Sequence, residues 1–203
     1  MTFEDLCQEK STWIVKYCSK TYEKPLFLIW YTDTDEDNTD RLLTYKTGEI
    51  FGIYALNDVK SILEKEKNRL MRHENLNSWL DGFSNLEPKE NACYDVDFIK
   101  TSIQNKSLEI PALESFADFV NLYGDFVYQD EGNRHLKIYL DDKRIQKVWS
   151  YFYNAVFWAR FNDKEKFETL DRPKLRIDLA KLLPKFQDLV GTFEERIKTT
   201  PPQ

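Results

Sequence analysis

Apolar residues form two short runs near the start of the chain, and each run predicts a β-strand. Trp13–Cys18 is rich in β-branched and aromatic residues. Leu26–Tyr31 is continuously apolar, which is typical of a central strand covered on both faces. Residues 41–46 and 50–54 flank Thr47-Gly48-Glu49, where glycine permits a positive φ, so we expect a hairpin there.

Two stretches of the first third have the hydrophobic periodicity of an α-helix. Phe3–Lys10 is amphipathic and predicts a short first helix. After Asn57, which we expect to be an N-cap, apolar positions recur every three or four residues. This stripe consists of Val59, Ile62, Leu63, Glu66 and Leu70. The first third is therefore expected to be an antiparallel sheet closed by an amphipathic helix.

The remainder of the chain reads as mainly helical. Helices are predicted over about 96–104, burying Phe98, and over 112–129 and 143–161. Residues 135–140 alternate and predict an edge strand, and Arg172-Pro173 predicts another helix start, with Pro184 breaking or kinking that helix. Polar residues and turn formers between 73 and 92 mark a candidate subdomain boundary within a single domain, 1–203.

These elements predict an α+β fold, with an N-terminal antiparallel sheet of about four strands and a helix, followed by a mainly helical C-terminal half. The 203 residues include 15% aromatic residues, which excludes intrinsic disorder. No apolar stretch reaches the roughly 20 residues that a membrane span requires. An acidic N-terminus without a signal-peptide pattern and three sparse cysteines favour a reduced, cytoplasmic protein.

The net charge of −6 is unevenly distributed along the chain. Residues 1–80 carry a net charge of −3, residues 81–140 carry −6 and residues 141–203 carry +3. Without a dense Lys/Arg cluster, nucleic-acid binding is disfavoured, and an acidic chain suits a basic protein partner. Two acidic surfaces and two aromatic rings are candidate partner contacts: Asp33, Asp35, Glu36, Asp37 and Asp40; Asp125, Asp130 and Glu131; and Tyr151 and Trp158.

The acidic loop 33–40 does not match a calcium-binding EF-hand, because Asn38 and Thr44 occupy the positions of its glycine and its glutamate. A solvated hairpin tip and a docking surface both stay open for this loop. His73 and His135 are isolated, and we predict that Asp95 and Asp142 are helix N-terminal residues rather than metal ligands. We therefore predict no catalytic residue, no metal site, no cofactor and no enzymatic activity.

Seven aromatic residues fall within one predicted helix: Trp149, Tyr151, Phe152, Tyr153, Phe157, Trp158 and Phe161. Apolar residues around most of a helix usually place it in the core, and the helix that begins near Leu113 is the expected packing partner. Rings left at the surface, such as those of Tyr151 and Trp158, would suit a protein interface.

The unit Leu42–Leu70 and the helical stretch Leu113–Phe126 resemble the small acidic immunity proteins of bacterial contact-dependent and polymorphic toxin systems. The resemblance implies a cytoplasmic protein that binds and neutralises a cognate toxin domain and is not an enzyme; it transfers no functional residues. The alternatives are a hydrolase or metal-dependent nuclease whose site is dispersed in sequence, and a regulatory binding module. The sequence does not determine the oligomeric state.

Overall fold

The computed structural model describes residues 1–34, 38–71, 74–83, 86–169 and 171–200. The strands are β1 (Thr12–Cys18), β2 (Leu26–Asp33), β3 (Thr39–Leu42), β4 (Ile50–Ile53), β5 (Ala92–Asp95) and β6 (Ile197–Thr199). The N-terminal helical segments are α1 (Phe3–Glu9), η1 (Leu56–Asp58), α2 (Val59–Glu66) and α3 (Glu74–Gly82). The later ones are α4 (Val96–Gln104), α5 (Ile110–Tyr128), η3 (Glu131–Leu136), α6 (Lys137–Leu140), α7 (Lys143–Phe152), η4 (Tyr153–Phe157), α8 (Trp158–Asn162), α9 (Lys164–Thr169) and α10 (Leu179–Glu194).

The strands form one mixed sheet in the order β5-β1-β2-β4-β6, with β3 also paired to β2. The α+β class is confirmed. The expected sheet of about four antiparallel strands is wrong in number and in direction, because β5 and β6 add to the sheet in parallel with β1 and β4. Both added strands are only three or four residues long, and neither carries a clear alternating pattern. Their pairing depends on where the intervening helices return the chain.

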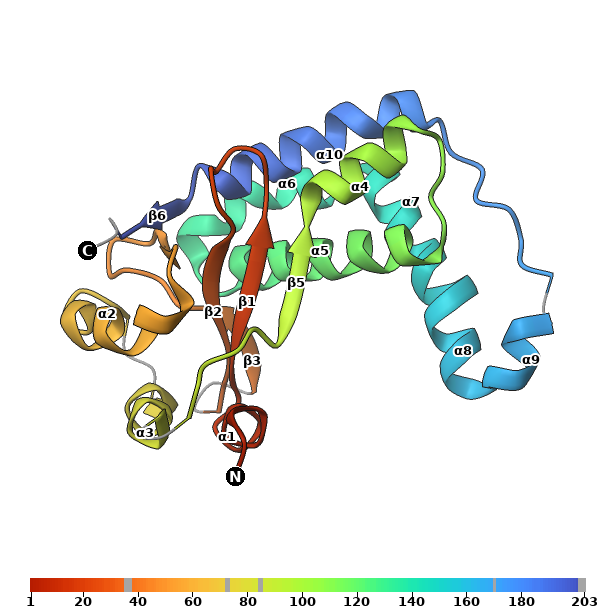
Figure 1. The fold of residues 1–203 in the computed structure, drawn as a ribbon. Helices are drawn as coiled ribbons and strands as arrows, with labels where there is room; N and C mark the ends of the chain where they lie inside the picture. Colours follow the sequence, from red (N-terminus) through yellow and green to blue (C-terminus); the bar gives the residue numbers. More distant parts are fainter. Residues whose placement is uncertain (35–37, 72–73, 84–85, 170, 201–203) are drawn as a thin grey trace.

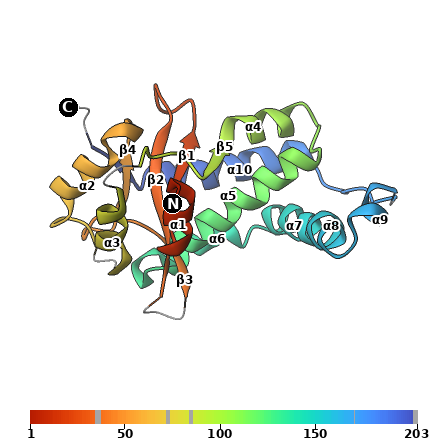
Figure 2. The ribbon, with the colours of Figure 1, turned by 60° about the horizontal axis from the view of Figure 1, so that its bottom comes forward.

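Helices cover both faces of the sheet. Ile14 and Ile29 face a cluster that includes α1, α2 and α3, whereas Val15 and Leu28 face the cluster built by α4, α5, α7 and α10. Figures 1 and 2 show the sheet between these two groups of helices. The expectation that β2 is a central strand covered on both faces is confirmed, since its inward residues alternate between the two clusters.

Several helix predictions are confirmed. α1 and α4 form where expected, and the predicted stripe is buried. The helix is shorter than predicted, because α2 ends at Glu66 and Leu70 forms a β-bridge with Tyr45. Asn57 is not an N-cap, because it lies inside the 3₁₀ turn η1 that precedes α2. Phe98 is 42% exposed rather than buried, since it points away from the face of α4 that carries Ile99. No helix in the described part of the chain combines the length and the apolar character needed to cross a bilayer.

The hairpin turn predicted at Gly48 is confirmed, with φ at +95°. The edge strand predicted over 135–140 is wrong: these residues form the end of η3 and then α6. Leu136 and Leu140 are both buried. They are four positions apart, which places them on one face of a helix, and this burial outweighs the short alternating pattern that predicted a strand. Residues 74–82 form a helix, and the predicted subdomain boundary near 73–92 stays a prediction.

The predicted helix start at Arg172 is also wrong, because α10 begins at Leu179 after an extended segment. The Asp178 side chain accepts a hydrogen bond from the Lys181 amide and caps this helix. Pro184 does not break α10; it lies in the second turn of a helix that continues to Glu194.

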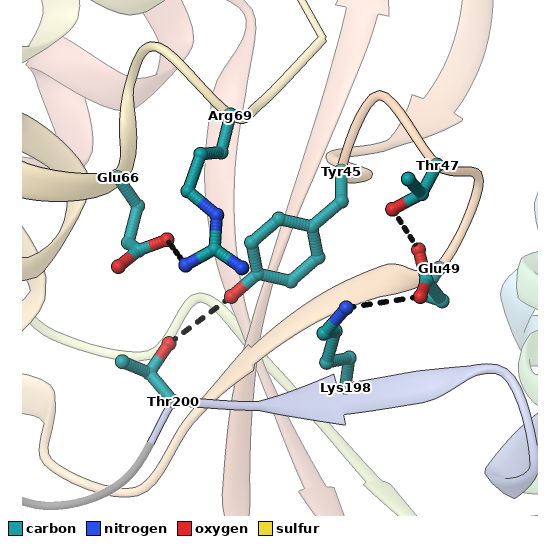
Figure 3. Close-up of polar contacts among 7 residues, drawn as sticks. All are labelled: Tyr45, Thr47, Glu49, Glu66, Arg69, Lys198 and Thr200. Carbon is teal, nitrogen blue, oxygen red and sulfur yellow. Dashed lines mark hydrogen bonds and ion pairs between the residues drawn. The ribbon is translucent and has the colours of Figure 1, made fainter.

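The last strand is held beside the hairpin by an aromatic and ionic contact. Figure 3 shows the Tyr45 ring between the side chains of Arg69 and Lys198. The Arg69 guanidinium carbon lies 5.4 Å and Lys198 Nζ 5.2 Å from the ring centroid, which are cation–π distances. Lys198 also pairs with Glu49 at 3.0 Å, and the Tyr45 hydroxyl lies 3.3 Å from Oγ1 of Thr200. The Lys198–Glu49 and Tyr45–Thr200 contacts join residues about 150 positions apart.

Candidate binding site: an acidic and aromatic pocket

A cavity of about 580 Å³ opens where β2 and β5 meet α5 and the helix that follows α6. We call it the acidic–aromatic pocket. Its described lining contains four carboxylates and five aromatic rings but no Lys, Arg or His: Asp40, Asp118, Asp125 and Asp141, and Trp30, Tyr94, Tyr128, Trp149 and Tyr153. Four further cavities among the described residues each have at least one Lys or Arg in their lining.

Helix α5 supplies two of the pocket carboxylates. Asp118 and Asp125 are seven positions apart, so two turns of helix place them on the same face. The opposite face of α5 is buried in the core through Phe119, Tyr123 and Phe126. The apolar face therefore fixes the direction in which both carboxylates point.

Asp125 lies in the half-buried part of the pocket. Trp30 Nε1 donates a hydrogen bond of 3.0 Å to its Oδ2 atom. Burial raises the pKa of the Asp125 carboxyl to about 7, and the nearby charge of Asp40 adds to this shift, while the hydrogen bond from Trp30 opposes it. Asp125 therefore changes its charge near neutral pH.

Asp118 lies closer to solvent. Desolvation by the surrounding chain, with a smaller contribution from Glu114, raises the pKa of the Asp118 carboxyl to about 6. The residue as a whole is nevertheless solvent-exposed, so water weakens the desolvation on which this shift depends.

Asn121 organises the aromatic wall. Its Nδ2 donates to the Tyr153 hydroxyl at 2.7 Å, and its Oδ1 accepts from Trp149 Nε1 at 2.8 Å. The two rings lie 4.6 Å apart between centroids. Tyr153 begins η4, a π-helical turn that interrupts the predicted long helix, and such turns are frequent at functional sites. The Asn121 side-chain amide and the π-helical turn η4 thus position the aromatic wall.

The other two pocket carboxylates have partners. Asp40 accepts a hydrogen bond of 2.7 Å from the Thr32 hydroxyl, and Asp141 pairs with Lys137 at 2.6 Å. Asp118 also lines the pocket and is solvent-exposed. The pocket therefore carries an excess of negative charge over the positive charge that contacts it.

The structure brings two of the predicted partner-binding residues together, because Asp40 and Asp125 line the same pocket although they are 85 positions apart in the sequence. Asp33 lies 3.3 Å from the Arg41 side chain and is engaged in an ion pair. Asp35, Glu36 and Asp37 lie outside the described residues.

The remaining predicted contacts are spread over the molecule. The Asp130 side chain caps η3 through the Gly132 amide, and Glu131 pairs with Arg134 at 3.2 Å. The Tyr151 hydroxyl donates to the Pro173 carbonyl at 2.7 Å and so holds the extended segment before α10. Trp158 is 49% exposed on α8. None of these four residues lines the pocket, and their contact with a partner stays a prediction.

Sequence reasoning missed Asp118, Trp30, Tyr94, Trp149 and Tyr153 as members of a common site. One signal was present: Asp118 and Asp125 are charged positions at helical spacing in an otherwise strongly apolar helix. The aromatic members carried no such signal, since their rings fit a core equally well.

The predicted roles of Asp95 and Asp142 as helix N-terminal residues are confirmed. Asp95 accepts from the Phe98 amide at 2.9 Å, and Asp142 accepts from the Arg144 amide at 2.8 Å. His135 Nδ1 lies 2.8 Å from the Gly132 carbonyl oxygen. No group of three or more His, Cys, Asp or Glu side chains with a metal-binding arrangement occurs among the residues that the structure describes.

No protein-family model matches the chain, and no curated protein matches it. Its fold is similar to the crystal structure of the SatS C-terminal domain in complex with bromine, with a TM-score of 0.60, 12% sequence identity, and coverage of 98% of this chain and 100% of that chain. At this identity the similarity concerns the fold alone. The architecture therefore has a solved counterpart, and the function must be argued from the pocket.

Proposed function

We propose that this chain is a binding protein whose acidic–aromatic pocket receives a cationic side chain, Lys or Arg, of a basic protein partner. The supporting observation is the pocket lining, in which carboxylates and aromatic rings occur without a basic residue among the described positions. Carboxylates attract a cation through charge, and aromatic faces attract it through their quadrupoles. A partly desolvated pocket of this kind suits an anchor residue at the centre of an interface.

The proposed biological role is that of a cytoplasmic immunity or inhibitor protein that neutralises a cognate toxin domain by binding it. The net charge of −6 and the concentration of acidic residues between 81 and 140 support a basic partner. Complementary charge accelerates association, which benefits an inhibitor that must act before its toxin does. In this role the chain needs neither a cofactor nor a catalytic residue.

The direct test is co-expression with the product of the neighbouring gene, followed by calorimetric titration of the purified pair. Asp118→Asn combined with Asp125→Asn should weaken the complex at pH 8 by about tenfold or more, because both changes remove charge and keep shape. The same variant should protect cells less well from the partner. The matched control is Glu64→Gln, which removes an acidic charge from an exposed position of α2, outside the pocket and outside the predicted partner contacts, and should leave the affinity nearly unchanged.

The pH dependence provides a second criterion. Because the pKa of Asp125 is raised to about 7, its carboxyl is largely protonated at pH 5.5 and largely ionised at pH 8. A cation should therefore bind more tightly at pH 8, and Asp125→Asn should reduce this difference. An affinity that is equal in the double variant and in the unmodified chain would overturn the pocket assignment. A neighbouring product without toxicity that still binds the pocket would favour a regulatory binding module.

The raised pKa values of Asp118 and Asp125 favour one alternative, an acid–base hydrolase, because catalytic carboxyl groups are commonly tuned toward neutrality. This alternative predicts hydrolysis of a substrate by the chain alone, with loss of turnover in both single Asn variants. A metal-dependent nuclease predicts in addition a thermal shift with Mg²⁺, Mn²⁺ or Zn²⁺. Binding without turnover distinguishes the proposed function from both.

A further inference from the structure

Two of the three cysteines lie side by side at one edge of the sheet. Cys18 ends β1 and Cys93 lies in β5, and their sulfur atoms are 3.9 Å apart. The two strands are parallel, with Lys16 opposite Cys93 and Cys18 opposite Asp95. The cysteines are therefore diagonal neighbours on the same face of the sheet, although they are 75 positions apart in the sequence.

The pair differs from an ordinary buried thiol. Cys93 is exposed and Cys18 is partly buried, whereas Cys7 is fully buried in the hydrophobic cluster that α1, α2 and α3 build. Neither the pocket nor the contacts of β6 use Cys18 or Cys93. A disulfide bond needs the sulfur atoms to close to about 2 Å, which requires rotation of both side chains and a small displacement of one strand. β5 lies at the edge of the sheet and is four residues long, so it is the strand that can move.

We propose that Cys18 and Cys93 form a reversible dithiol–disulfide pair that reacts with low-molecular-weight disulfides of the glutathione class. Disulfides of cytoplasmic proteins are usually of this transient kind. The proposal does not depend on the function proposed for the pocket.

Exposure sets the order of the reaction. The Cys93 thiolate attacks one sulfur of the small disulfide, forms a mixed disulfide and expels a small thiolate. Cys18 then loses its proton, attacks the Cys93 sulfur and expels the second small thiolate. Two protein thiols are oxidised, one small disulfide is reduced to two thiols, and the two protons pass to the released thiolates. Burial, with the adjacent Cys93 as a further cause, raises the pKa of the Cys18 thiol to about 11, which suits the second role rather than the first.

The Cys18–Cys93 disulfide would join β5 covalently to β1. Tyr94 follows Cys93 and lines the acidic–aromatic pocket, and Asp95 caps α4. Because successive residues of a strand point to opposite faces, the bridge and the Tyr94 ring lie on opposite sides of the sheet. Oxidation would therefore fix a strand that contributes to the pocket without placing the bridge inside it.

The test uses the full reduced chain treated with oxidised glutathione, with thiol titration under denaturing conditions and peptide mapping by mass spectrometry. We expect the loss of two thiols, a peptide linked through Cys18 and Cys93, and retention of the Cys7 thiol. Cys18→Ser should stop at a glutathione adduct on Cys93, and Cys93→Ser should react at least about tenfold more slowly at Cys18, since the exposed attacking thiolate is gone. Cys7→Ala is the control and should still form the bridge.

Three results would overturn the proposal: a glutathione adduct that persists on Cys93 of the unmodified chain, a dimer linked through Cys93, or three unreacted thiols. Peptide mapping of the unmodified chain tests the disulfide directly, so the proposal can be accepted or rejected even where a variant fails to fold. A return of both thiols when reduced glutathione is added in excess supports reversibility, and a bridge that resists it contradicts that part of the proposal.

Discussion

At the scale of single residues, the environment of Asp125 determines its chemistry. Its neighbour in sequence, Gly124, and the apolar face of α5 give no indication of a carboxyl that titrates near neutrality. The pKa of Asp125 is raised mainly because the packing of the sheet against α5 buries its carboxyl, and Asp40 adds to the shift while the hydrogen bond from Trp30 opposes it. Tertiary packing thus converts an ordinary acidic residue into a group whose charge depends on physiological pH.

Asp125→Asn is expected to stabilise the protein at pH 8. The folded-state pKa of about 7 exceeds the ordinary value of 3.8, so the folded chain binds more protons between these values and the free energy of unfolding falls as the pH rises through this range. Asparagine keeps the acceptor for Trp30 and removes the charge. The variant should gain on the order of 2 kcal/mol at pH 8, measured by urea unfolding, and the gain should vanish near pH 4. An equal or lower stability at pH 8 would contradict this.

At the scale of elements, short strands depend on close approach of neighbouring backbones. β6 pairs with β4 along only three residues, with Gly52 opposite Thr199. A Cβ atom on Gly52 would lie 2.9 Å from Cγ2 of Ile197. Glycine is thus required here by the neighbouring strand, while the φ angle of the residue is one that other residues adopt.

Gly52→Ala is expected to lower the free energy of unfolding by about 1 to 3 kcal/mol, because Ile197 must move to admit the methyl group. The matched control is Gly191→Ala in α10, where no atom lies within 4 Å of the added Cβ. That change should raise stability by about 0.5 to 1 kcal/mol, since alanine favours the helix. Denaturant midpoints measure both. Equal effects of the two substitutions would show that the contact with Ile197 is not limiting.

At the scale of the whole molecule, the sheet joins the two ends of the chain. β1 lies near one side of the sheet and β6 at the other edge, and the Tyr45 contacts hold β6 against the hairpin (Figure 3). The backbone continues this attachment, because the Ile50 amide donates to the Arg196 carbonyl and the Thr200 amide to the Gly52 carbonyl. The last helix therefore depends on strand pairing at its C-terminal end as well as on its apolar face.

Removal of all residues after Arg196 is expected to destabilise the whole domain by at least about 2 kcal/mol, because it removes β6, the Lys198 pair and the cation–π contact together. A chain that ends at Thr200 keeps these contacts and is the control. Thermal unfolding should show one lowered transition for the shorter chain and an almost unchanged one for the control. Equal melting temperatures for both truncated chains would contradict a role of β6 in stability.

The sequence alone determined the elements whose signal is local. The β1 and β2 runs, the helix over Val96–Gln104 and the buried stripe on α2 follow from hydrophobic period, because each pattern is complete within one element. The α+β class follows from their order along the chain.

Only the tertiary structure decided the parallel strands β5 and β6, the helical state of residues 137–140 and the pocket. A three- or four-residue strand has too few positions for a period, and its partner is chosen by where long helices return the chain. The pocket brings together residues that are far apart in the sequence: Asp40 and Asp125 both line it, and the Trp30 indole contacts α5. Its charge, like the nearness of Cys18 to Cys93, is a property of packed elements, and packing is the level at which proximity and desolvation arise.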